Sequence, residues 1–93
     1  MKPQELLALA DRVDASRSEN ATDVLVEIAL FEPNETVKGI RSNDAGTKVV
    51  YTYAGGKDVT AWAFDWTMDD YRADTSARLR ALATSRSQRV DES

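Results

Sequence analysis

The side chains with the greatest potential for chemistry are carboxylates between residues 65 and 74, namely Asp65, Asp69, Asp70 and Asp74. On a helix Asp70 and Asp74 share one face, so the cluster supplies weak candidates for oxygen ligands of a hard cation such as Mg²⁺. Acidic residues also gather at helix N-termini, because they interact favourably with the helix dipole. We favour this second explanation and expect no metal and no cofactor, since the glycine-turned, alternating ligands of a calcium loop are missing.

Other catalytic chemistry is restricted by the residue types that the chain lacks. The 93 residues include no histidine and no cysteine. The commonest general base and metal ligand are therefore absent, as are thiol nucleophiles, disulfides and zinc–thiolate sites. Gly55-Gly56-Lys57 lacks the longer glycine-rich span of a phosphate-binding loop and is followed by Asp58, so we interpret it as a hairpin turn. We expect no catalytic residues and a protein that is not an enzyme.

Aromatic residues are concentrated between residues 51 and 66: Tyr51, Tyr53, Trp62, Phe64 and Trp66. Such residues can form a stacking platform for single-stranded nucleic acid, but that function needs a basic groove around them. Residues 36–64 carry only four basic side chains against two acidic ones. We therefore expect most of the aromatic residues to be buried, Trp66 to be the most exposed, and no direct binding of nucleic acid.

The N-terminal part of the chain is strongly acidic. Residues 1–35 contain eight acidic and three basic side chains, within a whole-chain formal charge of −4. If the acidic residues line one helical face, they form a negative surface that complements a basic groove on a partner. A solvated helical exterior is the alternative explanation. The candidate partner-binding residues are Asp11, Asp14, Glu19, Asp23 and Glu27, with Trp66.

Two helices are expected in this acidic part. Apolar residues recur at helical spacing after Pro3, which suits the first turn of a helix, and predict a helix from Pro3 to Ala15. Asn20 can cap a second helix, with Asp23 as the capping-box partner. Residues 24–31 alternate as a strand would and also place apolar residues on one helical face, so the pattern leaves both open. The cap favours a helix.

Three strands are expected next, over Thr36–Arg41, Lys48–Tyr53 and Asp58–Trp66. With Gly55-Gly56 as a two-residue loop, Tyr51 lies opposite Thr60 and Val49 lies opposite Trp62. That register gathers large side chains on one face, which we expect the helices to cover. These side chains are Val49, Tyr51, Trp62 and Phe64.

A last helix follows, with Thr67 as its N-cap and Asp70 as the reciprocal partner. Its expected buried stripe consists of Met68, Tyr71, Thr75, Leu79 and Leu82. The chain is thus expected to form a single α+β domain over residues 1–83, with a polar, frayed tail at 84–93. Its fold is a three-stranded antiparallel sheet covered by helices, in the order α-α-β-β-β-α. No apolar run is long enough for a membrane span, and the missing cysteines suit the cytoplasm.

The N-terminal third resembles the small phage-encoded "ABA sandwich" proteins. The resemblance rests on Leu9-Ala10-Asp11-Arg12-Val13-Asp14-Ala15, on Asn20-Ala21-Thr22-Asp23 and on Ile28-Ala29-Leu30, with a loose echo in residues 65–70. It implies a bacteriophage or prophage origin, and it carries over no known chemistry and no site residue.

Three functional hypotheses follow. The first is a non-enzymatic phage-type accessory protein that binds a host protein through its acidic surface and inhibits it, as anti-CRISPR or anti-restriction proteins do. The expected host partner is a nucleic-acid-binding complex. The second is a structural or assembly protein that self-associates as a homodimer, through the Trp66 region or through the edge strand at residues 36–41. The third is a metal-dependent enzyme built on the aspartates at 65–74, which we rank last.

Overall fold

The computed structural model describes the backbone of residues 1–92 and the side chains of residues 1–87. The element order confirms the expected α+β fold and shows that the ambiguous second segment is a helix. The elements are α1 (Pro3–Ala15), α2 (Asn20–Leu30), β1 (Val37–Ser42), β2 (Val49–Tyr53), β3 (Asp58–Ala61) and α3 (Asp69–Glu92).

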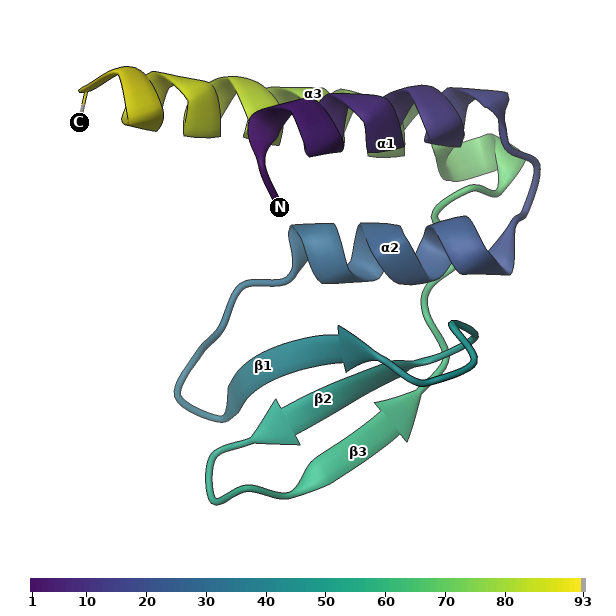
Figure 1. Cartoon of the computed structure of the whole chain (residues 1–93). Helices are drawn as coiled ribbons and strands as arrows, with labels where there is room; N and C mark the ends of the chain where they lie inside the picture. The colour runs from purple at the N-terminus through teal and green to yellow at the C-terminus, as the bar shows by residue number, and fades with distance from the viewer. Residues whose placement is uncertain (93) are drawn as a thin grey trace.

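The elements form three layers (Figure 1). Helices α1 and α3 lie side by side, α2 lies beneath them, and the sheet lies on the other side of α2. The main core fills the space between the helices, where apolar side chains are buried at helical spacing on α1, α2 and α3. Its buried members are Leu6, Leu9, Ala10, Val13, Val26, Ala29, Leu79 and Ala83.

The sheet is an antiparallel meander in the order β1-β2-β3. Its hairpin register differs from the expected one by one residue, because Tyr51 pairs with Val59 and Val49 pairs with Ala61. The loop between β2 and β3 has three residues rather than two, since the Tyr53 N–H donates to the Lys57 carbonyl at 2.7 Å. A one-residue slip moves every side chain of a strand to the other face.

The predicted aromatic face is therefore wrong. Strand β3 ends at Ala61 rather than at Trp66, and Trp62 is 69% exposed. Phe64 is about half exposed, whereas Trp66, expected to be the most exposed aromatic residue, is half-buried against the core.

Two predicted helix caps are also wrong. Glu19, not Asn20, is the N-cap of α2, and the Asn20 side chain instead donates to the Thr47 carbonyl. Thr67 does not cap α3, because its hydroxyl is engaged by residues of α2 and the turn before it.

Helix α3 differs from its expected form at both ends. Met68 precedes the helix and Tyr71 lies in its first turn, and both side chains are exposed, although the sequence predicts them in the buried stripe. Thr75 and Leu79 of that stripe are buried as expected. The helix continues to Glu92, through the segment that the sequence predicts to be frayed. Within the described residues, no helix has the length and apolar character needed to cross a membrane.

Candidate protein-binding site

The connection between β3 and α3, residues 62–68, brings apolar side chains to the surface. The Phe64 ring packs edge-on against Trp66, with centroids 4.9 Å apart, and contacts Tyr71 at 5.1 Å. Trp66 is partly buried against the helical core and anchors this group. Phe64 and Tyr71 remain 47% and 43% exposed, with Met68 exposed beside them in the chain. We call Phe64, Met68 and Tyr71, anchored by Trp66, the aromatic surface.

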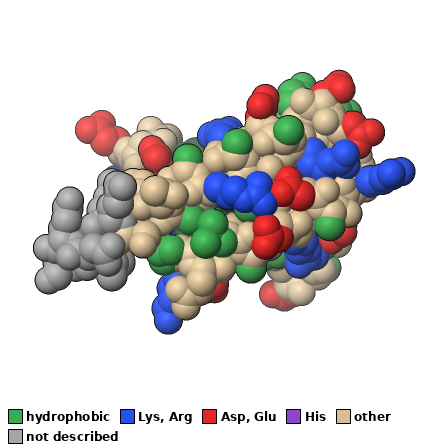
Figure 2. Space-filling view, turned by 90° about the horizontal axis from the view of Figure 1, so that it is seen from above, with side chains coloured by type: hydrophobic (Ala, Val, Ile, Leu, Met, Phe, Trp, Pro, Cys, Tyr) green, Lys and Arg blue, Asp and Glu red, His purple; other side chains and the backbone are tan. Residues whose placement is uncertain are grey.

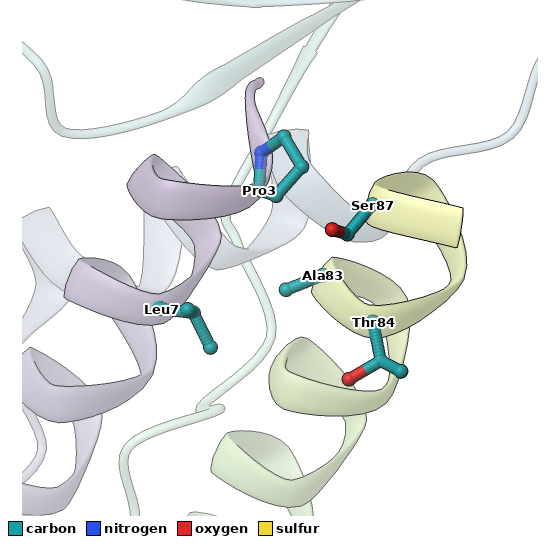
Figure 3. A pocket seen from close by; sticks show the side chains of 5 residues that line it. All are labelled: Pro3, Leu7, Ala83, Thr84 and Ser87. Carbon is teal, nitrogen blue, oxygen red and sulfur yellow. The ribbon is translucent and has the colours of Figure 1, made fainter. Parts of the chain in front are cut away.

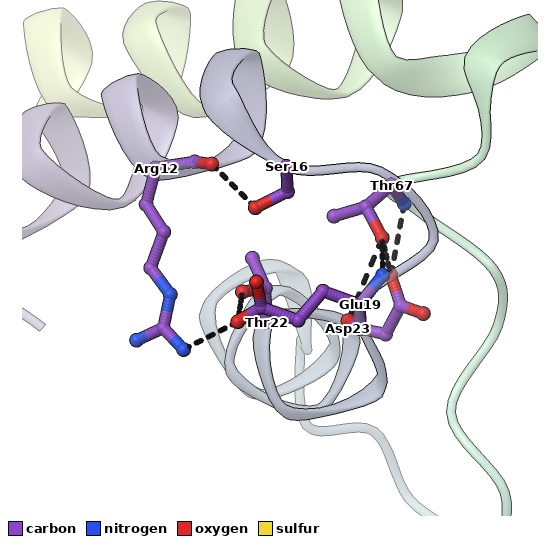
Figure 4. A network of polar contacts seen from close by, with 6 residues as sticks. All are labelled: Arg12, Ser16, Glu19, Thr22, Asp23 and Thr67. Atoms are coloured by element: carbon purple, nitrogen blue, oxygen red, sulfur yellow. Dashed lines mark hydrogen bonds and ion pairs between the residues drawn. The ribbon is translucent and has the colours of Figure 1, made fainter.

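A buried hydrogen-bond group fixes the C-terminal end of this connection (Figure 4). Thr67 is fully buried, and both its N–H and its hydroxyl donate to Asp23 Oδ1 at 2.8 Å. The same hydroxyl oxygen accepts the Glu19 N–H at 2.7 Å, and the Thr67 carbonyl accepts the Ser18 N–H at 3.1 Å. Thr67 is thus bonded on all its polar atoms to the turn and first residues of α2.

Burial of the Asp23 carboxylate raises its pKa, because low-dielectric surroundings disfavour the charged form. Its hydrogen bonds with Thr67 oppose this rise, whereas the nearby acidic groups of Asp65 and Glu19 add to it. Asp23 is therefore an internal structural acceptor and is not available to a partner.

Glu27 fixes the middle of the connection from one turn further along α2. Its Oε1 accepts the backbone N–H of Phe64 and the indole N–H of Trp66, both at 3.1 Å. Two carboxylates on one face of α2 therefore hold the connection at two points, and they set where the aromatic surface is presented.

The charges around the aromatic surface are mostly acidic. The exposed carboxylates of Asp65, Asp69, Asp70 and Asp74 lie on or just after the connection. Asp69 pairs with Arg72 at 2.9 Å, and the Arg78 guanidinium lies over the Trp66 ring, 5.3 Å from its centroid. In the part of the chain that the structure describes, no three acidic side chains are grouped to hold a metal ion.

The other predicted acidic residues form internal ion pairs. Arg80 of α3 contacts Asp11 at 2.9 Å and Asp14 at 2.6 Å, and Arg12 contacts Glu19 at 2.8 Å. Figure 2 shows acidic and basic side chains intermingled over α1 and α3. The structure therefore does not gather the predicted acidic residues into one unpaired surface.

These pairs also shift the acidity of the carboxyl groups. The neighbouring Ser76 hydroxyl and the Arg80 guanidinium lower the pKa of Asp14. The Arg12 guanidinium and the Thr22 hydroxyl lower the pKa of Glu19 in the same way. Both carboxyl groups are held in their charged form by their partners.

Sequence reasoning missed the structural use of Asp23 and Glu27. The signal for it was present, because the two acids are spaced four residues apart, Asp23 directly before the apolar run from Val24 to Leu30 and Glu27 within it. Acidic residues interrupting an apolar helix need hydrogen-bond donors when they are buried. The sequence did not indicate that Thr67 and the indole of Trp66 would supply those donors.

The described residues form several open pockets, and two of them, of about 330 and 340 Å³, have Glu5 with Arg12 and Glu32 with Arg78 in their lining. A pocket of about 240 Å³ lies between the start of α1 and α3 (Figure 3). Its described lining consists of three apolar residues and two hydroxyl groups, from Pro3, Leu7, Ala83, Thr84 and Ser87. This lining contains no ionisable side chain that could act as an acid or a base.

Neither a protein-family model, nor a curated protein, nor a solved structure matches this chain.

Proposed function

We propose that this chain is a non-enzymatic protein that binds a nucleic-acid-handling protein of a bacterial host and inhibits it. The partner contact is the aromatic surface, not the helical face formed by α1 and α2. The observation that carries the proposal is that Phe64 and Tyr71 contact each other at the surface, each close to half exposed, while smaller side chains fill the core.

The composition of this surface supports binding to a protein. Aromatic residues and methionine are enriched at protein interfaces, and the few residues that dominate binding energy are often aromatic. The connection is also held in place by Asp23 and Glu27 before any partner arrives. A preorganised surface loses less conformational entropy on binding than a flexible loop does.

The surrounding carboxylates favour a basic partner. Asp65, Asp70 and Asp74 are exposed beside the apolar centre, so the surface complements an apolar patch bordered by lysine and arginine. Proteins that contact the phosphate backbone present such basic surfaces. The same carboxylates repel nucleic acid, which favours a protein partner over direct nucleic-acid binding.

The resemblance to phage-encoded ABA-sandwich proteins supports the remaining part of the proposal. It favours a phage or prophage origin and action in the host cytoplasm. An inhibitor of this kind acts as anti-CRISPR or anti-restriction proteins do, by occupying the nucleic-acid site of its target.

Capture from a nuclease-treated bacterial lysate tests the proposal. We expect the tagged wild-type chain to retain one dominant nucleic-acid-binding protein, and the Phe64→Ser/Tyr71→Ser variant to lose it. Leu7→Ser is the matched control, because Leu7 is 46% exposed but lies on α1. The purified partner should bind DNA or RNA less tightly when the wild-type chain is added.

Two outcomes contradict the proposal. One is equal capture by the wild type and the double variant when circular dichroism shows that both are folded. The other is a captured partner whose nucleic-acid affinity is unchanged by the chain at saturating concentration. Asp65→Lys/Asp70→Lys, with Asp44→Lys as control, tests the charge argument separately, and only the first variant should lose the partner.

A further inference from the structure

The Arg78 guanidinium is held in place without an acceptor for its N–H groups. It lies over the Trp66 ring, 5.3 Å from the ring centroid. Among the described residues, no ion pair and no side-chain hydrogen bond engages it, and Asp74 one turn earlier on α3 does not pair with it. An arginine stacked on an aromatic ring presents its N–H groups at the edge of its plane, where they fit a carboxylate with two parallel bonds. Arg78 is therefore a preorganised donor.

Arg78 stands at an open pocket with an apolar lining. The pocket has a volume of about 340 Å³ and lies between the end of α2 and the middle of α3. Leu30, Ala81 and Leu82 supply its apolar part, and Glu32 is its other charged residue. An aliphatic side chain from another molecule fits this part of the surface next to a group that binds Arg78.

The pocket of about 330 Å³ at α1 and α2 shows what is particular here. It also has one glutamate and one arginine in its lining, Glu5 and Arg12. The chain itself uses both, because Arg12 bonds to Glu19 at 2.8 Å and Glu5 accepts a backbone N–H at 3.0 Å. Within the described residues, Arg78 has no such bond. An unpaired arginine beside apolar side chains matches protein interfaces, in which arginine is enriched.

This pocket and the aromatic surface lie on one side of the molecule. Phe64 packs on Trp66 at 4.9 Å and Arg78 lies over the same ring, so contacts connect the aromatic surface to the pocket. Tyr71 and Arg78 are seven residues apart on α3, which places them on one helical face about 10 Å apart along the axis. A stable interface uses about 20–30 residues on each side, so a partner must contact more than the aromatic surface.

We infer that the partner that binds the aromatic surface also places a carboxylate on Arg78 and an aliphatic side chain in the pocket beside it. The inference rests on the proposed function and adds the chemistry of the partner's segment. Exposed charges at four-residue spacing on α3 are negative at Asp70 and Asp74 and positive at Arg78. The complementary segment is basic at one end and acidic at the other, and this change of sign fixes its direction along α3. A carboxylate suits Arg78 better than a phosphate, because Asp74 and Glu32 repel a group of higher charge more strongly.

Charge reversal at Arg78 tests the ion pair. The probe is the protein that the wild-type chain captures from nuclease-treated lysate, purified and titrated with each variant. Arg78→Glu should raise the Kd about tenfold or more, and Arg78→Lys should lie between it and the wild type. The proposed partner is basic, so a reversal that met no carboxylate would strengthen binding instead. Arg17→Glu is the matched control, because Arg17 is exposed in the turn before α2, and it should not weaken binding.

Filling the pocket tests its apolar part. Ala81 is exposed on α3, so Ala81→Phe should leave the fold intact while its ring occupies the pocket. We expect the Kd to rise about tenfold. Ala73→Phe is the matched control, because Ala73 is also exposed on α3 but is turned by roughly 200° from Tyr71. Circular dichroism checks that both variants are folded, and an equal Kd for the two contradicts the use of the pocket.

Coupling with a carbodiimide, which joins an amine to a carboxylate in contact with it, locates the partner's acidic residue. The amine that Arg78→Lys introduces should couple to an aspartate or glutamate of the captured protein, as mapped by mass spectrometry, whereas the amine from Arg17→Lys should not. Absent coupling at position 78, or an Arg78→Glu variant that binds as tightly as the wild type, overturns this inference alone. Capture that survives Phe64→Ser/Tyr71→Ser, or no capture by the wild type, overturns the proposed function and this inference with it.

Discussion

Thr67 is the residue on which the position of the connection depends most. Its hydroxyl donates to Asp23 and accepts from the Glu19 N–H, and its own N–H also donates to Asp23, all inside the protein. Among the described residues, no buried side-chain nitrogen or oxygen lacks a partner. Removing one member of such a group costs more than an average hydrogen bond, because the remaining members stay buried and unpaired.

Thr67→Val tests this argument with almost no change of volume. The substitution leaves the Glu19 N–H without its acceptor and removes one of the two donors to the Asp23 carboxylate. We expect the free energy of unfolding to fall by about 1–3 kcal/mol, measured by urea denaturation at pH 7. Thr67→Ser keeps the hydroxyl and should lose clearly less stability. A loss in Thr67→Ser as large as that in Thr67→Val would contradict the argument, because the hydroxyl would then contribute no more than the methyl group.

At the scale of elements, hydrophobic periodicity and backbone chemistry predicted much of the fold. Pro3 and the spacing of the apolar residues gave the bounds of α1. The expected cap at Asn20 favoured a helix for α2, which the structure has, although Glu19 is the residue at the N-cap. The order α-α-β-β-β-α followed from these patterns. Each of these features depends on residues close together in the chain.

Features that depend on a single residue of register, or on distant contacts, were not predictable in this way. Two adjacent glycines fit a two-residue loop and a three-residue loop equally well, and the choice between them decides which face Trp62 occupies. The role of Thr67 needs a contact 44 residues away with Asp23. The acidic candidates were identified as charged residues, but their arginine partners lie on other elements or across a turn.

The hairpin loop can be tested through its glycines. Gly56 has a φ of +91°, a region that side chains rarely adopt, whereas Gly39 in β1 lies outside that region and has open space for a Cβ atom. Gly56→Ala should therefore lower the free energy of unfolding by about 1–2 kcal/mol through backbone strain. Gly39→Ala is the matched control and should be neutral or slightly stabilising. Urea denaturation of both variants makes the comparison. An equal effect at both positions would contradict the loop conformation.

At the scale of the whole molecule, ion pairs connect elements that share few other polar contacts. Arg80 links α3 to α1, Arg12 links α1 to the start of α2, and Arg41 on β1 reaches Asp58 on β3 across the middle strand. The Arg41 guanidinium and the Thr52 hydroxyl lower the pKa of Asp58. Exposed pairs contribute little singly. Their common consequence is that stability depends on these carboxylates remaining charged.

The dependence of stability on pH should therefore contain two opposite contributions. The pKa values of Asp14 and Asp58 are lowered from 3.8, so the unfolded chain binds more protons than the native one just below that value. Their stabilisation is complete above pH 3.8 and is lost as the pH falls through the native pKa. The pKa of Asp23 is raised from 3.8, so its contribution has the other sign and declines as the pH rises through the native pKa.

Asparagine substitutions separate the two contributions, because the amide keeps the shape of the side chain and does not titrate. Relative to the wild type, Asp14→Asn should lose most stability at neutral pH, and the difference should shrink below pH 3.8. Asp23→Asn keeps an acceptor for Thr67, and its stability relative to the wild type should rise as the pH increases above 3.8. Urea midpoints measured from about pH 3 to about pH 7 give both curves. If the stability difference from the wild type changes with pH in the same direction for both variants, the opposite pKa shifts are contradicted. If the two differences change in opposite directions, Asp23 is the carboxylate whose ionisation opposes the stabilisation by the surface ion pairs.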